Sequence, residues 1–122
     1  MTKLIPITTS PDFAPKESIC AEENRVEGIP EYKSWSLDAA LNEAANWGQV
    51  RTGIWEMTPG AHVSIKGETF EFCHILSGKV VISENGGESH TFGAGDSFIM
   101  KPGMVGTWKT LETVKKIYVI AS

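Results

Sequence analysis

The segment PGAHVSIKGETFEFCHILSGKVVI (residues 59–82) consists of short runs of β-branched and aromatic residues separated by glycines. Runs of this kind, bounded by glycine turns, are typical of β-strands. Side chains along a strand alternate between two faces, so Glu71 and Cys73 are expected on one face and His74 on the other. The segment therefore predicts strands and separates the histidine from the carboxylate.

The same kind of run recurs on both sides of this segment. The predicted strands have the sequences VRTGIWEM, HVSIK, TFEFCHIL, KVVIS, SHTFG, SFIM, GTWKTL and KKIYVIA. Between KVVIS and SHTFG lies ENGGE, and its Asn-Gly and Gly-Gly pairs are typical of a tight hairpin. Many short strands with little helix predict an all-β sandwich or barrel.

The N-terminal part of the chain has a different composition. Four of the six prolines lie in the first thirty residues, whereas eleven of the twelve glycines lie from Gly48 onward. Because proline lacks an amide donor and restricts the residue before it, we predict an extended arm over residues 1–34 and a single domain over residues 35–122. Within SWSLDAALNEAANWG (residues 34–48), apolar residues at helical spacing after Ser36 indicate one short helix.

Length and charge exclude several classes of protein. A chain of 122 residues is long enough for one core, and its net charge of −4 with scattered basic residues gives no binding surface for nucleic acid or anionic lipid. No stretch reaches the roughly 18 apolar residues of a membrane span, and we expect a cytoplasmic protein. Cys20 and Cys73 lie far apart in the sequence, so we expect neither a disulfide framework nor a zinc knuckle.

Two segments resemble the paired motifs of the cupin superfamily of small β-barrels, namely residues 59–82 and GAGDSFIMKPGMVGTW (residues 93–108). The sequence is most similar to the single-domain cupins akin to the ethanolamine-utilisation protein and ureidoglycine aminohydrolase. The resemblance runs from about Trp55 to Ala121. It implies an RmlC-like jelly-roll β-barrel, with the arm outside the matched region.

In the first cupin motif, the position of the carboxylate falls on Glu71. Counting back from this residue, the two histidine positions of the family fall on Ile65 and Gly67, or on Ser64 and Lys66 with the longer spacing. None of these four residues is a histidine. The glycines Gly60 and Gly78 at the two ends of the motif are present, so the resemblance implies a barrel in which Glu71 is the one retained metal-ligand position of the first motif.

The second motif shows the same loss. Gly95, Asp96 and Gly103 keep their places, the proline has moved to Pro102, and Gly106 stands where the family has a histidine. Catalytic first-row metal sites generally hold three or more protein ligands. We therefore expect neither a tightly bound metal nor another cofactor, and the metal-dependent activities of related cupins do not carry over directly.

The resemblance implies that Glu71 points into the barrel mouth, where a carboxylate is costly unless it is paired or used. We predict a ligand site that contains Glu71, Trp55, Trp108, Lys66 and Cys73. Glu71 is also the catalytic candidate, as a hydrogen-bond acceptor or as a general base if burial raises its pKa. The alternative is a salt bridge that ties strands together, for which Lys66 is the nearest cation in the sequence; Lys66 equally fits an exposed loop.

The other candidates have simpler alternatives. Cys73 as a nucleophile requires a nearby cation, which its strand neighbours do not supply, so a small buried hydrophobic role is favoured. His74 is interpreted as a packed residue of the outer face rather than a relay, and His62 and His90 as solvated strand residues. Trp55 and Trp108 suit the core or a pocket wall.

These observations predict a protein that binds a small polar metabolite in the barrel mouth, as a homodimer whose arm crosses onto the partner. Two alternatives remain. In the first, Glu71 and a histidine from another strand hold a divalent ion in a metal-dependent enzyme of the aminohydrolase or dioxygenase kind. In the second, the barrel is filled by side chains and the protein is a non-catalytic interaction module. Whether the protein is an enzyme is left open by the sequence.

Overall fold

The computed structural model describes residues 6–38 and 48–122. The described residues form a single curled antiparallel sheet of nine strands and one short 3-10 turn. The elements are β1 (Lys16–Ile19), η1 (Glu22–Asn24), β2 (Arg25–Glu27), β3 (Glu31–Asp38), β4 (Val50–Met57), β5 (Gly60–Ile65), β6 (Phe70–Glu84), β7 (Ser89–Gly93), β8 (Ser97–Met100) and β9 (Val105–Ala121). The all-β class predicted from the strand pattern is confirmed.

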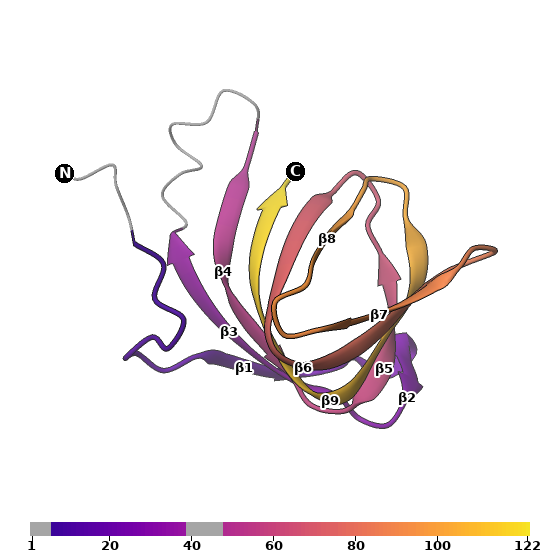
Figure 1. Ribbon diagram of the computed structural model, residues 1–122, viewed down its shortest axis with the longest axis horizontal. Coiled ribbons are helices and arrows are strands. Elements are labelled where there is room, and N and C mark those ends of the chain that lie inside the picture. The colour runs from indigo at the N-terminus through magenta and orange to yellow at the C-terminus, as the bar shows by residue number, and fades with distance from the viewer. Residues whose placement is uncertain (1–5, 39–47) are drawn as a thin grey trace.

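The two longest strands, β6 and β9, hold the sheet together. They pair with each other along their whole length, from Phe70 opposite Ala121 to Glu84 opposite Gly106. The first part of β6 also pairs with β8 and its second part with β7, while β9 pairs with β5 and then with β4. The sheet therefore curls around a common interior, with β3 and β4 on one side and β5 on the other (Figure 1).

Strand β6 bends at Gly78 without leaving the sheet. The pairing register shifts between Ile75 and Val80, and Gly78 has a φ of 89°. A Cβ atom at this position would lie 2.2 Å from the carbonyl oxygen of Thr113, so only glycine fits. The predicted strands TFEFCHIL and KVVIS are therefore one strand, and GTWKTL and KKIYVIA are likewise joined in β9. The predicted hairpin at ENGGE is confirmed by the pairing of β6 with β7.

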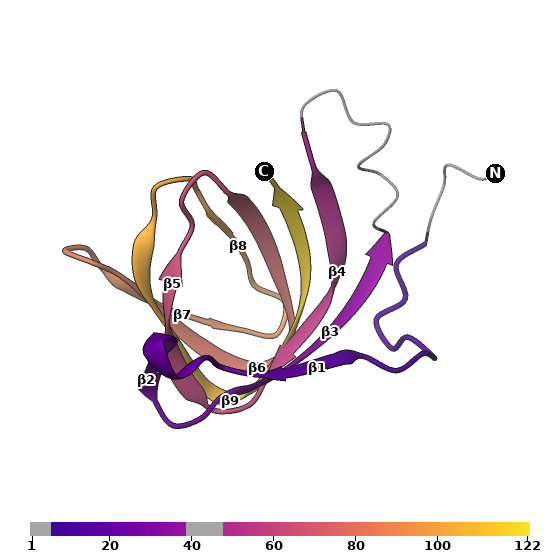
Figure 2. The ribbon, with the colours of Figure 1, turned by 180° about the vertical axis from the view of Figure 1, so that it is seen from behind.

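Much of the predicted arm lies in the sheet. β1 pairs with β3 and β2 pairs with β5, and Figure 2 shows β1 along the outside of the curled sheet. The boundary predicted at residue 34 falls within β3, and the crossing of this segment onto a partner chain stays a prediction.

The predicted short helix falls mainly on residues 39–47, which lie outside the described residues. The prediction that this helix begins after Ser36 is wrong, because Ser36 and Asp38 belong to β3. They lie opposite Gly53 and Thr52 of β4. Pairing with a neighbouring strand outweighs the weak helical preference of a segment this short.

The core lies inside the curl, where alternate residues of both long strands face inward. Its members are Met57, Cys73, Ile75, Val80, Ile82, Met100, Trp108 and Val114. Burial alternates residue by residue from Phe70 to Ile75, as expected for a strand with one inward face. Within the described ranges, the protein contains no helix long and apolar enough to cross a membrane.

Candidate functional site

Strand β6 directs Glu71 and Cys73 into the interior. Glu71 is 5% exposed and Cys73 is fully buried, whereas His74 faces the other side and its Nδ1 lies 2.7 Å from the Ser97 hydroxyl oxygen. The alternation predicted from the sequence is confirmed. His74 takes no part in the arrangement around Glu71.

Both carboxylate oxygens of Glu71 accept a hydrogen bond from a lysine ammonium group. Lys66 Nζ lies 2.7 Å from Oε1 and Lys116 Nζ lies 2.6 Å from Oε2. Lys66 follows β5 and Lys116 belongs to β9, so the carboxylate joins three parts of the sheet. The sequence left two alternatives for Lys66, a place in an exposed loop or a salt bridge with Glu71. The structure shows the salt bridge. We call these residues the Lys66–Glu71–Lys116 cluster.

The ammonium group of Lys116 lies between two tryptophan rings. Its Nζ is 4.3 Å from the ring centroid of Trp55 and 4.5 Å from that of Trp108, distances at which the negative face of an aromatic ring stabilises a cation. The two rings meet edge to face, with centroids 5.4 Å apart. The predicted placement of both tryptophans in the core or at a pocket wall is confirmed, and they also contact a buried cation.

The cluster keeps its charges inside the protein. Burial by itself would raise the pKa of Glu71, but the neighbouring Lys116 and Lys66 lower it from 4.5 to about 2. Burial would likewise lower the pKa of Lys116, and its contacts with Cys73 and Glu71 outweigh this and raise it. A general-base role for Glu71 requires a raised pKa. Because the pKa is lowered instead, the carboxylate stays ionised, and both of its oxygens are already paired with lysines.

Cys73 lies next to a cation that the sequence argument did not find. Lys116 Nζ is 3.5 Å from its sulfur, and the thiol donates a hydrogen bond to Glu71 Oε2 at 3.2 Å. The prediction that Cys73 has no nearby cation was wrong, because Lys116 belongs to a strand that is distant in the sequence. Burial nevertheless raises the pKa of Cys73 to about 12, so the thiol stays protonated and the non-nucleophilic interpretation holds.

A pocket of about 260 Å³ opens beside the cluster. It contains Glu71, Trp55, Trp108 and Lys66, four of the five residues predicted for the ligand site; Cys73 lies behind Glu71 and Lys116. The other lining residues are Ser34, Arg51, His62, Ser64, Met100, Lys116, Tyr118 and Ile120. The pocket therefore combines an aromatic wall with several charged and polar groups.

His62 belongs to this pocket, although the sequence suggested a solvated strand residue. Its Nδ1 donates to the carbonyl oxygen of Val63 at 2.9 Å, and its ring lies nearly parallel to that of Trp108. Burial first, and then the charges of Lys116 and Lys66, lower the pKa of His62, so the ring is neutral and Nε2 is an acceptor. Nε2 is buried and has no hydrogen-bond partner among the described residues. His90, in contrast, has an exposed side chain, as expected.

Sequence reasoning missed Lys116. The signal was present in β9, where Val114, Lys116 and Tyr118 alternate and would share a face. The adjacent Lys115 made it impossible to tell which lysine points inward until the register of the strand was known.

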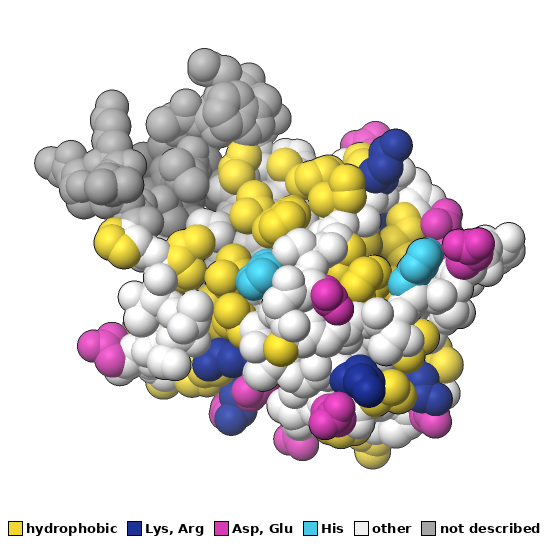
Figure 3. All heavy atoms as spheres, viewed as in Figure 1, with side chains coloured by type: hydrophobic (Ala, Val, Ile, Leu, Met, Phe, Trp, Pro, Cys, Tyr) yellow, Lys and Arg dark blue, Asp and Glu magenta, His cyan; other side chains and the backbone are white. Residues whose placement is uncertain are grey.

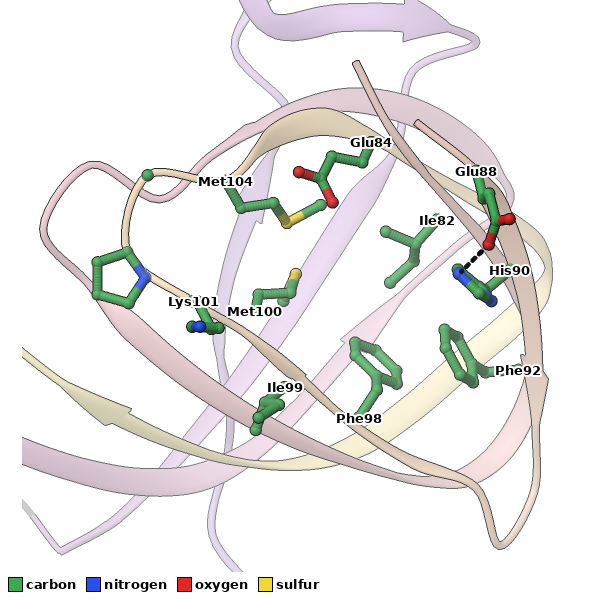
Figure 4. Close-up of a pocket in the computed structure, with 12 residues that line it drawn as sticks. Ile82, Glu84, Glu88, His90, Phe92, Phe98, Ile99, Met100, Lys101 and Met104 are labelled. Atoms are coloured by element: carbon green, nitrogen blue, oxygen red, sulfur yellow. Dashed lines mark ion pairs between the residues drawn. The ribbon is translucent and has the colours of Figure 1, made fainter. Parts of the chain in front are cut away.

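A second, larger cavity of about 800 Å³ lies between the β6–β7 hairpin and β8. Figure 4 shows Phe92, Phe98 and Met100 pointing into it, with Glu84, Glu88 and Lys101 towards its edge. The rings of Phe92 and Phe98 are stacked with centroids 4.3 Å apart. Hydrophobic side chains also reach the surface in several places on this side of the molecule (Figure 3). Met100 lines both cavities, but the charged cluster belongs to the smaller one.

Residues 44–118 match the family model of the EutQ-like cupin domain, which covers more than half of the chain. The chain belongs to the EutQ-like cupin family. The resemblance seen in the sequence motifs is therefore confirmed. No curated protein matches the sequence of this cupin.

Solved structures with the same fold include several small cupins. A protein of unknown function of the DUF861 family from Pseudomonas syringae pv. tomato has a TM-score of 0.78 and 23% identity over 94% of this chain and 46% of its own. The EutQ protein of Clostridium difficile has a TM-score of 0.62 and 14% identity, over 82% of this chain and 77% of its own. A predicted oxalate decarboxylase from Thermotoga maritima has a TM-score of 0.68 and 17% identity, over 95% of this chain and 97% of its own. This cupin spans about half the length of the Pseudomonas protein, and these likenesses concern the fold.

The residues of this cupin do not fit the metal ion that many cupins hold. Both oxygens of Glu71 already contact ammonium groups, and the described residues contain no group of three His, Cys, Asp or Glu side chains placed to hold an ion. At Gly106, where the second motif would carry a histidine, a Cβ atom would lie 2.1 Å from the Ser83 carbonyl oxygen. His62 lines the pocket with Glu71, but the Lys66–Glu71–Lys116 cluster leaves no free carboxylate to join it.

Proposed function

We propose that this cupin binds a small polar metabolite in the pocket beside the Lys66–Glu71–Lys116 cluster, without a tightly held metal. The observation that supports this is a buried charged cluster on the wall of an open pocket. Removing charges from water costs several kcal/mol per ion, and apolar residues of similar size often stabilise a fold as well or better. A charged cluster kept at a pocket wall therefore favours a role in binding over a role in stability.

The size and lining of the pocket support the same conclusion. At about 260 Å³ it lies just below the usual range of roughly 300–1,000 Å³ for ligand pockets, which favours a metabolite of few atoms. Trp55 and Trp108 supply apolar surface, and Ser64 and His62 supply polar groups that fix an orientation. An interaction module was expected to have a filled barrel, so the open pocket favours the ligand-binding alternative.

A thermal-shift screen of small metabolites tests this proposal. Compounds that raise the melting temperature are then measured with Ser64→Leu, which places a larger side chain in the pocket, and with the matched control Thr91→Leu on the exposed face of β7. Binding should be lost in Ser64→Leu and retained in Thr91→Leu. A screen without a single stabilising compound, or compounds that bind Ser64→Leu as well as the parent, would contradict the proposal.

A further inference from the structure

The charge of the pocket is opposite to that of the whole protein. Three cationic side chains, Arg51, Lys66 and Lys116, line it together with one carboxylate, Glu71, which leaves a formal charge of +2 with His62 neutral. The 122-residue sequence carries a net charge of −4. A positive, partly closed pocket in an acidic protein attracts anions locally, and the field is stronger there than in open water.

The hydrogen bonds inside the pocket indicate which groups are left for a ligand. Both oxygens of Glu71 are taken by lysines, so Glu71 is a positioning residue that holds the ammonium groups rather than the acceptor for a ligand. Lys116 is enclosed by Glu71, Cys73 and two tryptophans. Lys66, with a side chain 15% exposed, has three N–H donors of which Glu71 uses one.

Arg51 provides the second available cation. It lies at the start of β4, is exposed, and lines the same pocket. A guanidinium group offers a planar set of donors that matches a carboxylate better than any other side chain does. Lys66 and Arg51 together therefore suit a carboxylate more than a neutral or cationic ligand.

His62 adds a second requirement. Its Nε2 is an acceptor without a partner among the described residues, and leaving a buried acceptor unpaired is unfavourable. Because Nε2 is buried in this structure, a hydroxyl or amino group of the ligand would reach it only after the ring rotates and gives up the hydrogen bond from Nδ1 to Val63.

On these grounds we infer that the ligand is a small carboxylate that also carries a hydroxyl or amino donor, bound by Lys66 and Arg51 through the carboxylate and by His62 through the donor. This inference rests on the proposed function, and it names the chemical class of the ligand. It assigns Glu71 the role of holding Lys66 and Lys116 in place.

Four compounds with the same three-carbon skeleton test the inference by calorimetry. Lactate has both the carboxylate and the hydroxyl group, and propionate lacks the hydroxyl. Lactamide keeps the hydroxyl but is neutral, and 1-amino-2-propanol keeps the hydroxyl but carries a positive charge. Lactate should bind about tenfold or more tightly than lactamide, as expected for hydrogen bonds to charged groups, and more tightly than propionate. Its binding should weaken as salt is raised. Equal or tighter binding of lactamide or 1-amino-2-propanol would overturn the anionic ligand, and equal binding of propionate would overturn the role of His62.

Variants locate the effect in the pocket. Lys66→Gln and Arg51→Gln should each weaken lactate binding about tenfold, and Lys66→Arg should retain much of it. Lys79→Gln removes the same charge from an exposed position of β6 and should leave binding unchanged. Because Arg51 is exposed, its variant is expected to fold even if Lys66→Gln does not. The inference would be overturned if Arg51→Gln bound lactate as tightly as the parent and a folded Lys66→Gln variant did so too.

The metabolite screen separates failure of this inference from failure of the proposed function. If none of the four compounds binds, anionic compounds among the screen's pocket ligands would support the inference. Pocket ligands that are all neutral or cationic would overturn it and leave the proposed function intact. A screen without any pocket ligand would contradict both.

Discussion

Lys116 Nζ lies 2.6 Å from Glu71 Oε2, and the two residues are 45 positions apart in the sequence. The pair joins the inner faces of β6 and β9, which form the longest pairing in the sheet. Lys66 completes the cluster from the end of β5. The same contacts that neutralise Glu71 therefore connect both halves of the curled sheet beside the pocket.

Removing the charge of Glu71 should destabilise the protein. Glu71→Gln leaves Lys116 buried without its carboxylate, and breaking a buried pair in this way costs about 3–5 kcal/mol. Urea unfolding of the parent and the variant measures the difference. Glu68→Gln, at an exposed position in the preceding turn, is the matched control and should change the stability by about 0.5 kcal/mol or less. A loss below about 1 kcal/mol in Glu71→Gln would contradict the expected cost of leaving Lys116 buried without its carboxylate.

The stabilisation by Glu71 should depend on pH in a defined window. The pKa of Glu71 is lowered on folding from 4.5 to about 2, so its contribution is complete above 4.5 and is lost as the pH falls towards 2. The shift corresponds to about 3 kcal/mol at neutral pH. Unfolding curves of parent and Glu71→Gln, compared at several pH values, should converge below this window. A difference in stability that is the same at pH 3 as at pH 7 would contradict the expected linkage.

Both cysteines should resist modification in the folded protein. Cys73 is fully buried with its pKa raised to about 12, and Cys20 is 2% exposed. An aromatic disulfide reagent at pH 8 should therefore release little thiolate from the native protein and react with both cysteines after denaturation. Rapid reaction of Cys73 without unfolding, traced by mass spectrometry of the peptides, would show that the thiol is accessible and activated.

Two glycines separate the effect of backbone conformation from that of close packing. Gly78 and Gly95 have φ angles of 89° and 90°, but only at Gly78 would a Cβ atom meet backbone, at 2.2 Å from the Thr113 oxygen. Gly95→Ala should cost about 1–2 kcal/mol from its φ alone, and Gly78→Ala about 2–5 kcal/mol. Denaturant unfolding of the two variants gives the comparison. Equal losses would mean that β6 and β9 can move apart at the bend without cost.

Purified protein should contain less than one transition-metal ion per chain. The reason is that Lys66 and Lys116 occupy both oxygens of Glu71 and that Gly106 has no room for a side chain. Elemental analysis after purification without chelator measures the metal content. A tightly held ion in stoichiometric amount, lost in His62→Ala, would favour the metal-dependent alternative.

Local features of the site followed from the sequence alone. The alternation of β6 placed Glu71 and Cys73 on one face and His74 on the other, because side-chain direction along a strand depends only on neighbouring residues. The hairpin at ENGGE also followed from the sequence, because the conformation of a tight turn depends on the residues of the turn itself. The motifs around Glu71 and Gly95 also pointed to the cupin family.

The sequence by itself determined the all-β class, the cupin family and the inward direction of Glu71, since each depends on short-range patterns or on a motif. Only the tertiary structure decided that Lys116 faces inward and Lys115 does not, because this depends on the register between β6 and β9 and on the shifts around Gly78. It also decided that His62 is buried against Trp108 and that β1 and β2 join the sheet. These features arise from pairings between residues distant in the chain, and the charge and remaining hydrogen-bonding capacity of the pocket depend on such pairings.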